Sequence, residues 1–377
     1  MLKNTAIPNT FRSTPIVYAA AKEYQIFVPV TEPCVMWIAV DGYTEGEFYD
    51  DCNGVLRSDV DVHRIVVPME VLDAGRGYTV HFRRVIERRP YSSVVDDVCS
   101  THFPFRPVPD GKVNIYHIAD AHNHIDAPIA CGRYFGEELD LLILNGDIPN
   151  HAGEKLGLEA IITIASQLTQ GEIPVVFARG NHDTRGAFAE HLFEVAPSVN
   201  GRSYYTVRLG DMWFLVLDCG EDKDDSNHQY GHCNCFHNFR LQETKFIEDV
   251  IARADEEYNA PGVKHRFVLC HTPFAYTKDA PFNIEIELYT YWSRIIKENI
   301  HPEMMLCGPL HRTLLCPIGG ELDHKGQPCT LVLASQCIKK DDSFAVGGAL
   351  TVTPEAIDIV FNANSGEIVG QERIELN

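Results

Sequence analysis

Six apolar segments after residue 112 each run into a polar or glycine residue, and this feature constrains the fold more than any other. They are VNIYHIAD, LDLLILNGD, IPVVFARGNHD, MWFLVLD, HRFVLCH and MMLCG, which reach Asp120, Asp147, Asn181, Asp218, His271 and Gly308. Between them, residues 154–168 and 241–257 have the apolar spacing of helices. Buried strands alternating with helices predict an α/β layered domain, which binds ligands at the carboxyl ends of its strands.

The first 108 residues have a different sequence pattern. Short strand-like runs are separated by turn-forming segments such as DGYTEGE, DDCNG and DAGRG. The runs are Ile16–Ala20, Tyr24–Val30, Cys34–Val40, Val62–Pro68 and Tyr78–Ile86. About seven short strands in about 100 residues are typical of an immunoglobulin- or fibronectin-like β-sandwich. FRPVPDGK, with two prolines and a glycine, marks the boundary, so we predict an all-β domain at 1–108 and an α/β domain at 109–377.

The charge of the chain is concentrated in the second predicted domain. The formal net charge is -21. Residues 1–108 hold 11 Lys and Arg against 14 Asp and Glu, and residues 109–377 hold 21 against 39, which gives -3 and -18. Such a field repels polyanions, so we expect no nucleic-acid partner. A small phosphate ester remains compatible if metal cations reverse the local sign.

The N-terminal segment and the cysteines bear on the compartment. No apolar run approaches 18 residues, and the first 25 residues contain no continuous apolar core of a signal peptide. We therefore predict no membrane span and a cytoplasmic location. The twelve cysteines are spread along the chain, and Cys270, Cys307 and Cys337 fall in or next to apolar runs. Buried free thiols in a reducing compartment are favoured over disulfides.

Residues able to bind metal ions gather at the ends of the predicted core strands. They occur as Asp120-Ala-His122, Gly146-Asp147, Gly180-Asn181-His182-Asp183, His271, and His311 within CGPLH. Carboxylate and amide oxygens mixed with imidazoles suit Zn, Mn or Fe better than Ca or Mg. Two such ions about 3.5–4 Å apart can share one carboxylate and activate a hydroxide. Any one of these motifs is weak, but the ordered set is specific.

The ordered set resembles the calcineurin-like metallophosphoesterase superfamily, whose pattern is D-x-H, G-D, G-N-H-[DE], a lone H and G-H-x-H. The resemblance covers about residues 113–315 and implies a four-layer αββα sandwich with its site at one edge. It implies that one metal ion is held by Asp120, His122, Asp147 and His311, and the other by Asp147 as bridge, Asn181 and His271.

The same resemblance implies roles for four further residues around the GNHD motif. His182 would lie near the phosphate, stabilise the transition state and protonate the leaving group, and Asp183 would orient His182. Arg179 and Arg185 flank the motif; each either contacts phosphate oxygens or is a structural arginine.

The β-rich N-terminal region resembles the small β domain of purple acid phosphatase-like members. At the position of their iron-binding tyrosine this chain has Asn150, so no Fe(III)–tyrosinate centre is expected.

One position departs from the family pattern. The motif G-H-x-H reads Gly308-Pro309-Leu310-His311, so a ligand of the second ion is replaced by proline, which has no donor atom. Three alternatives follow: the second ion binds weakly, a residue of the loop Asp222–His237 substitutes, or catalysis is lost. Three protein ligands and water can still hold zinc.

The loop Asp222–His237 follows a core strand and is rich in Asp, Asn, His and Gly. We interpret it as a loop that covers the substrate, as long loops next to active sites often do. The alternative is a separate structural zinc site at His232, Cys233, Cys235 and His237, whose spacing matches no familiar zinc motif.

The sequence therefore predicts a metal-dependent phosphoesterase that hydrolyses a small mono- or diester with two divalent transition-metal ions. The alternative is a weakly active or non-catalytic phospholigand-binding module, which Pro309 favours. A third reading treats the N-terminal sandwich as an adhesion or carbohydrate-binding unit; docking onto the catalytic domain is the role we favour for it.

Overall fold

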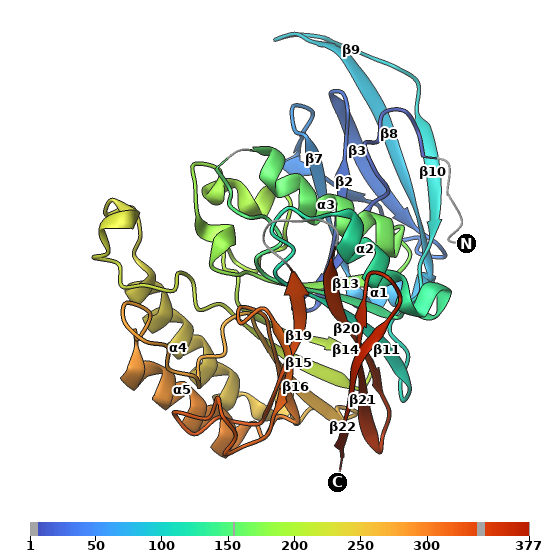
Figure 1. Cartoon of the computed structure of the whole chain (residues 1–377). Helices are drawn as coiled ribbons and strands as arrows, with labels where there is room; N and C mark the ends of the chain where they lie inside the picture. Colours follow the sequence, from blue (N-terminus) through green and yellow to red (C-terminus); the bar gives the residue numbers. More distant parts are fainter. Residues whose placement is uncertain (1–6, 154, 338–343, 377) are drawn as a thin grey trace.

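The computed structural model describes residues 7–153, 155–337 and 344–376 (Figure 1). The first hundred residues form ten strands and one short helix. These are β1 (Ile16–Ala20), β2 (Glu23–Pro29), β3 (Cys34–Val40), β4 (Phe48–Tyr49), β5 (Asp51–Cys52), β6 (Val55–Leu56), β7 (Val62–Pro68), α1 (Met69–Gly75), β8 (Gly77–Arg88), β9 (Ser93–Val95) and β10 (Cys99–Pro104).

The remainder of the chain alternates strands with helices. The strands are β11 (Val113–Ile118), β12 (Leu141–Asn145), β13 (Pro174–Ala178), β14 (Tyr205–Leu209), β15 (Met212–Leu217), β16 (His265–Cys270), β17 (Met304–Cys307), β18 (Arg312–Cys316), β19 (Thr330–Cys337), β20 (Ala345–Val352), β21 (Ala356–Ala363) and β22 (Ile368–Glu375). The helices are α2 (Asp126–Gly132), α3 (Lys155–Thr169), α4 (Phe236–Ala252) and α5 (Ile286–Asn299), with short 3-10 turns η1 (Arg133–Glu138), η2 (His182–Thr184), η3 (Ala189–Glu194), η4 (His228–Tyr230) and η5 (Ala254–Glu256).

Two sheets face each other in this second region and are joined through β19. One contains β11, β12 and β13 in parallel, and the other contains β15, β16 and β17 in parallel. Strand β19 pairs with β17 and with β20, so a single path of hydrogen-bonded strands runs through both sheets. The polar residues that follow β11, β12, β13, β16 and β17 therefore come out at the edge where the two sheets meet.

The side chains of the parallel strands alternate between two cores. Ile115 and Ile143 point inward and pack with Phe214, Phe267 and Leu306 from the facing sheet. The outward residues of β11 to β13 pack against α2 and α3, and those of β15 to β17 pack against α4 and α5. Each strand is therefore buried on both faces, which explains its continuous apolar sequence. The predicted four-layer αββα arrangement is confirmed (Figure 1).

The five predicted N-terminal strands are confirmed within a few residues as β1, β2, β3, β7 and β8. Strands β10, β8, β3 and β4 form one sheet, which packs on β1, β2 and β7 through a shared apolar core. Strand β1 also pairs in parallel with β13, with Val17 opposite Pro174. The N-terminal region thus extends the sheet of β11, β12 and β13 edge to edge. The domain boundary at 108/109 and the immunoglobulin or fibronectin type stay predictions.

The two predicted helices are present with one shifted start. Helix α3 matches the predicted 154–168 segment, residue 154 itself lying outside the described residues. Helix α4 begins at Phe236 rather than at Leu241. The carboxylate of Asp225 accepts hydrogen bonds from the backbone N–H groups of Phe236 and His237 at 2.9 Å each, which caps the helix from a distant loop.

Every cysteine of the described residues is a free thiol, and Cys270 and Cys307 are buried as predicted. The side chain of Cys337 lies outside the described residues. Among the described residues, no helix combines the length and apolar character that a membrane crossing requires.

Candidate metal centre

The loops that leave β11, β12 and β17 place their polar residues in an unusual backbone conformation. Asp120, His122, Asp147 and His311 all have positive φ, between 47° and 53°. Non-glycine residues rarely adopt this region, and such strain concentrates at functional sites. The sharp change of direction at each strand end turns these side chains toward one point.

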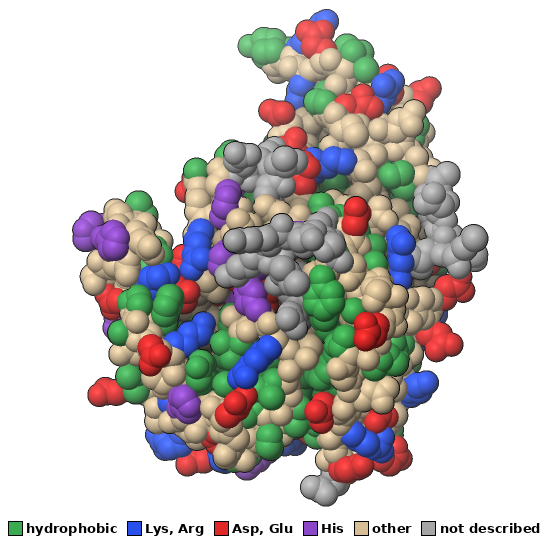
Figure 2. Space-filling model, in the orientation of Figure 1, with side chains coloured by type: hydrophobic (Ala, Val, Ile, Leu, Met, Phe, Trp, Pro, Cys, Tyr) green, Lys and Arg blue, Asp and Glu red, His purple; other side chains and the backbone are tan. Residues whose placement is uncertain are grey.

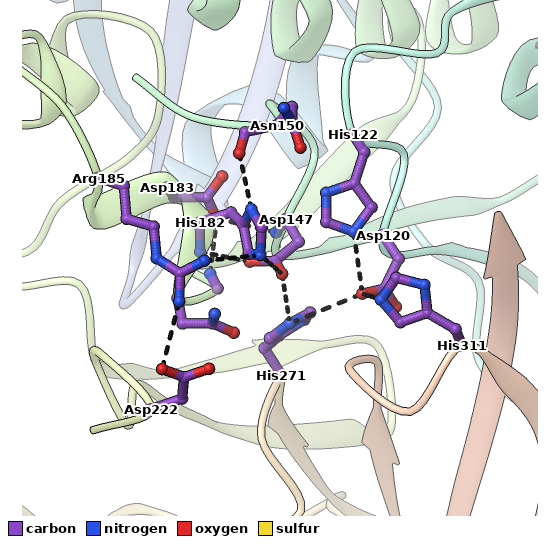
Figure 3. Close-up of polar contacts among 12 residues, drawn as sticks. Asp120, His122, Asp147, Asn150, His182, Asp183, Arg185, Asp222, His271 and His311 are labelled. Atoms are coloured by element: carbon purple, nitrogen blue, oxygen red, sulfur yellow. Dashed lines mark hydrogen bonds and ion pairs between the residues drawn. The ribbon is translucent and has the colours of Figure 1, made fainter. Parts of the chain in front are cut away.

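The structure brings the predicted Asp and His ligands together (Figure 3). Asp120 Oδ1 lies 3.3 Å from His311 Nε2, 3.7 Å from His122 Nε2 and 4.0 Å from His271 Nε2. Asp147 Oδ2 lies 3.3 Å from His271 Nε2 and 3.8 Å from His182 Nε2.

Three groups of ligand atoms are close enough to share a metal ion, each with its atoms within 4.8 Å of one another: Asp120, His122 and His311; Asp120, Asp147 and His271; and His122, Asp147 and His182. The groups overlap, because Asp120, His122 and Asp147, the predicted bridge, each belong to two of them.

The burial of these groups fits a site for cations. The carboxylates of Asp120 and Asp147 are 0% and 2% exposed, and burying two carboxylates side by side is unfavourable without positive charge. Both ring nitrogens of His122 are buried and have no hydrogen-bond partner among the described residues. Buried polar atoms are normally paired, so the donor set suits divalent metal ions.

The pKa shifts of the ligand residues also fit a site for cations. Burial alone would lower the pKa of His271, but the charge of Asp147 outweighs it and raises the pKa to about 10. Burial opposes ionisation of Asp147, and His271 outweighs this effect and lowers the pKa of Asp147. Burial lowers the pKa of His122 to about 3. The two buried carboxylates thus hold a positive charge between them, as they would hold a metal ion.

Three glycines allow the loops to approach this closely. A Cβ atom on Gly146 would lie 2.5 Å from Gly180 N and 2.8 Å from the ring of His271. A Cβ atom on Gly180 would lie 2.3 Å from Asp147 Oδ1, and one on Gly308 would lie 2.5 Å from His271 Nδ1. These contacts leave no room for a side chain. The glycines of the motifs are therefore needed for packing between the ligand loops.

Backbone carbonyls orient two of the imidazoles. His271 Nδ1 donates to the carbonyl of Asn145 at 2.6 Å, which turns Nε2 toward the carboxylates. His182 Nδ1 donates to the carbonyl of Asn150 at 2.6 Å, and its Nε2 accepts from Arg185 Nη1 at 2.8 Å (Figure 3). In this pattern Nε2 of His182 carries a lone pair and no proton, which disfavours His182 as the group that protonates the leaving group.

The carboxyl group of Asp183 joins the two loops that meet at Asp147. Its Oδ2 accepts from the backbone N–H groups of Asp147 at 3.1 Å and Gly180 at 2.6 Å. The side chain is fully buried, and burial together with the charge of Asp147 raises its pKa to about 8. These bonds fix the G-D loop against the G-N-H-D loop, and the orienting role of Asp183 toward His182 stays a prediction.

The two flanking arginines have different surroundings. Arg179 Nε lies 2.6 Å from the buried carboxylate of Asp218, and its guanidinium lies over the rings of Phe236 and Phe239. These contacts favour the structural alternative for Arg179. Arg185 reaches His182 at the metal centre and is held from behind by Glu221.

Asn181 lies between two residues that contact Asp147. The backbone N–H of His182 donates to Asp147 Oδ1 at 2.7 Å, and Gly180 packs against the same carboxylate. Asn181 itself is 6% exposed. It therefore sits in the loop that closes over Asp147, and its role as a metal ligand stays a prediction.

The loop Asp222–His237 contributes no member to the three ligand groups, all described residues considered. His232, Cys233, Cys235 and His237 do not form a metal-binding group among the described residues either, and His237 instead contacts Glu285 Oε1 at 2.8 Å. The zinc alternative is therefore not supported. The start of the loop does reach the site, because Asp222 Oδ1 lies 3.3 Å from Arg185 Nη2.

The sequence profile of the calcineurin-like phosphoesterase family matches residues 113–303. The chain belongs to this family. The match includes every strand-end motif of the family up to His271, whereas His311 lies beyond it. No curated protein sequence matches the chain.

Two solved structures share the fold of this family member over nearly its whole length. A purple acid phosphatase from yellow lupin (Lupinus luteus) seeds has 13% identity and a TM-score of 0.58, and the alignment covers 97% of this chain and 75% of that one. PhoD has 12% identity and a TM-score of 0.56, with 98% and 94% covered. Both alignments include the β-rich N-terminal region, so the architecture expected from the resemblance is confirmed.

Sequence reasoning missed three partners of the site: the carbonyls of Asn145 and Asn150, and the carboxylate of Glu221. Glu221 binds Arg185 through two hydrogen bonds of 2.8 and 2.9 Å and is 1% exposed. A backbone carbonyl leaves no signal in a sequence. Glu221 lies in the acidic run GEDKDD, where no pattern distinguishes it from its neighbours.

Proposed function

We propose that this protein hydrolyses phosphoesters with two divalent transition-metal ions, of the Mn, Zn or Fe type. The observation that supports it most directly is the overlap of the three groups of ligand atoms, in which Asp120, His122 and Asp147 each belong to two groups. When bound, such ions supply Lewis acidity toward phosphate oxygens and make hydroxide available near neutral pH. We assign Asp120, His122, Asp147 and His311 to one ion, and Asp147, Asn181 and His271 to the other.

The residues of the chain position the substrate around that centre. Arg185 and His182 lie side by side next to Asp147, where a cation and an imidazole can contact the oxygens of a phosphate. Asn150 fixes the ring of His182, and Glu221 fixes the guanidinium of Arg185. Because these groups are held before substrate binds, they stabilise charge in the transition state without rearranging.

The substrate we propose is a small phosphoester. The acidic surface of the α/β domain argues against nucleic acid as partner, and a cytoplasmic location remains our expectation from the sequence.

The proposal is tested by measuring release of nitrophenol from p-nitrophenyl phosphate and from bis-p-nitrophenyl phosphate with added Mn or Zn. We expect metal-dependent hydrolysis of at least one of them, abolished by a chelator. The Pro309→His variant restores the missing ligand type next to Gly308, and we expect it to retain the second ion at lower metal concentration. Metal-loaded protein that hydrolyses neither ester, before or after this substitution, contradicts the proposal.

Pro309 also supports the second candidate, a phospholigand-binding module that has lost catalysis. This reading requires that phosphate binds to the metal-loaded protein although neither ester is hydrolysed. Calorimetric titration with inorganic phosphate separates it from a protein that lacks the site altogether.

Metal binding is expected to displace protons from the centre. Because the pKa of His271 is raised to about 10, its imidazole is protonated at pH 7 and must release that proton to become a ligand. The apparent affinity for Zn should therefore rise with pH, by about tenfold per unit for one proton. Titration calorimetry at pH 7 in two buffers of different ionisation enthalpy measures the release directly. Equal apparent enthalpies in the two buffers would contradict the assignment of His271.

A further inference from the structure

A group of cationic side chains lies next to the metal centre, on the side of Arg185. Lys223 Nζ lies 2.7 Å from Asp222 Oδ1, and Arg185 Nη2 lies 3.3 Å from the same oxygen. Lys223 and Lys278 both approach the ring of Phe282, at 4.9 and 6.0 Å from its centre. These three cations therefore converge from three separate loops on a single region.

The charges in this region do not balance. Arg185, Lys223 and Lys278 face two carboxylates, Glu221 and Asp222. Glu221 is fully engaged by Arg185 and Tyr230, and Asp222 is shared by Arg185 and Lys223. Within the part of the chain that the structure describes, Lys278 forms no ion pair. Two further carboxylates, Asp147 and Asp120, act on Lys278, but both are assigned to the metal ions, so with the ions bound Lys278 has no carboxylate partner of its own.

Burial disfavours the charged form of Lys278. Its side chain is partly buried, and burial lowers its pKa, whereas the charges of Asp222, Asp147 and Asp120 act in the opposite direction. The ammonium therefore lies within electrostatic reach of the metal ligands without touching them. The loop that carries it is anchored by Lys325, whose Nζ donates to the carbonyls of Phe274 and Tyr276 at 3.2 and 2.9 Å.

The region is distinct from the point where the ligands of the metal centre meet. From Asp147 the contacts run to His182, then to Arg185, then to Asp222, and finally to Lys223. Figure 3 shows Asp222 on the Arg185 side of the site, away from His311. Figure 2 shows Lys and Arg side chains beside histidines on one face of the molecule. A group bound by Lys223 and Lys278 is therefore separate from a phosphate held at Asp147.

We propose that Lys223 and Lys278, next to Arg185, form an anion subsite that selects phosphoesters carrying a second negatively charged group, either a carboxylate or another phosphate. The proposal rests on the phosphoesterase function. Asp222 occupies the subsite in the absence of substrate and gives way to the second anion of the substrate, which then accepts hydrogen bonds from the lysines. The positive charge of Lys278 thus favours substrates that carry a second anionic group.

The test compares esters that differ in the second charge. One pair is 3-phosphoglycerate with glycerol 3-phosphate, which differ by a carboxylate; the other is fructose 1,6-bisphosphate with fructose 6-phosphate, which differ by a phosphate. We expect kcat/KM to be about tenfold higher for the ester with the second anionic group in at least one pair. This is the size expected for a hydrogen bond to a charged group. The pair that responds identifies the kind of anion.

Substitutions of the two lysines test whether they cause this preference in kcat/KM. Lys278→Met should reduce it to about twofold or less, mainly through KM, and Lys278→Arg should retain most of it. Lys223→Met is a second, independent variant with the same expected effect. Lys245→Met, at an exposed position of α4, is the matched control and should change nothing.

The outcomes separate this proposal from the phosphoesterase function. Hydrolysis of all four esters without preference overturns the subsite alone. An equal loss on both members of a pair in Lys278→Met also overturns it, because the lysine then serves the reacting phosphate. Absence of turnover for all four esters and for the nitrophenyl esters overturns the phosphoesterase function and the subsite with it.

Discussion

Replacing Asp147 by Asn should lower the phosphoesterase kcat/KM by about a thousandfold or more, the range seen when a central electrostatic group is removed. Asp147 is the residue assigned to both proposed ions, and it lies within the overlapping groups of ligand atoms, so loss of its charge should weaken both sites. An amide keeps the shape of the side chain and can still accept the N–H of His182 at Oδ1. The loss should therefore come from weakened metal binding and not from unfolding.

Three measurements define this result. Steady-state kinetics with p-nitrophenyl phosphate gives the loss of activity, elemental analysis of the dialysed protein gives the number of bound ions, and thermal unfolding gives the stability. Asp255→Asn, at an exposed position of η5, removes one carboxylate from the same domain and should leave all three unchanged. A metal-loaded Asp147→Asn protein with near-wild-type turnover would refute the shared bridge.

The second large effect is expected at Asp183 and concerns stability. Asp183→Ala removes the acceptor of two buried N–H groups, those of Asp147 and Gly180. Leaving two buried donors unpaired costs about 1–3 kcal/mol each, so the free energy of unfolding should fall by about 2–6 kcal/mol. Urea denaturation of the metal-free protein measures this loss without interference from ion binding.

A conservative variant separates the hydrogen bonds from the charge. Asp183→Asn keeps one acceptor oxygen at the same position, and it removes a carboxyl group whose pKa is raised to about 8 by burial and by the charge of Asp147. Because that carboxyl is largely neutral at pH 7, the amide should cost less than about 1.5 kcal/mol, within the range of a single hydrogen bond. Equal losses in the two variants would mean that the backbone contacts of Asp183 contribute little.

In the N-terminal region, the sequence pattern predicts the strands but not their pairing. The alternation in YTVHFRRVI predicts a strand, and β8 spans it with buried residues alternating with partly buried ones over Tyr78–Arg83. The parallel pairing of β1 with β13 could not be predicted. Both are short buried strands with apolar neighbours, and many pairings of such strands would satisfy the same pattern.

At the metal centre, too, the sequence predicts some features, and the tertiary structure decides others. Asp120, His122, Asp147, His271 and His311 were each identified because they follow an apolar strand, and parallel strands must deliver their carboxyl ends to one edge. The roles of Asp183 and Arg179 were not determined by this rule. Asp183 turns to the backbone of its neighbours, and Arg179 turns to Asp218, a choice that depends on loops distant in the sequence.

The sequence by itself determined the layers of the α/β domain, the ligand types and their order, since local periodicity and residue chemistry act over a few neighbouring positions. Only the tertiary structure decided which nitrogen of each histidine faces the carboxylates, which arginine reaches the site, and that Lys278 lies beside it without an ion pair to any described residue. These features depend on backbone carbonyls and on side chains from separate loops, whose positions are set by the packing of the whole domain.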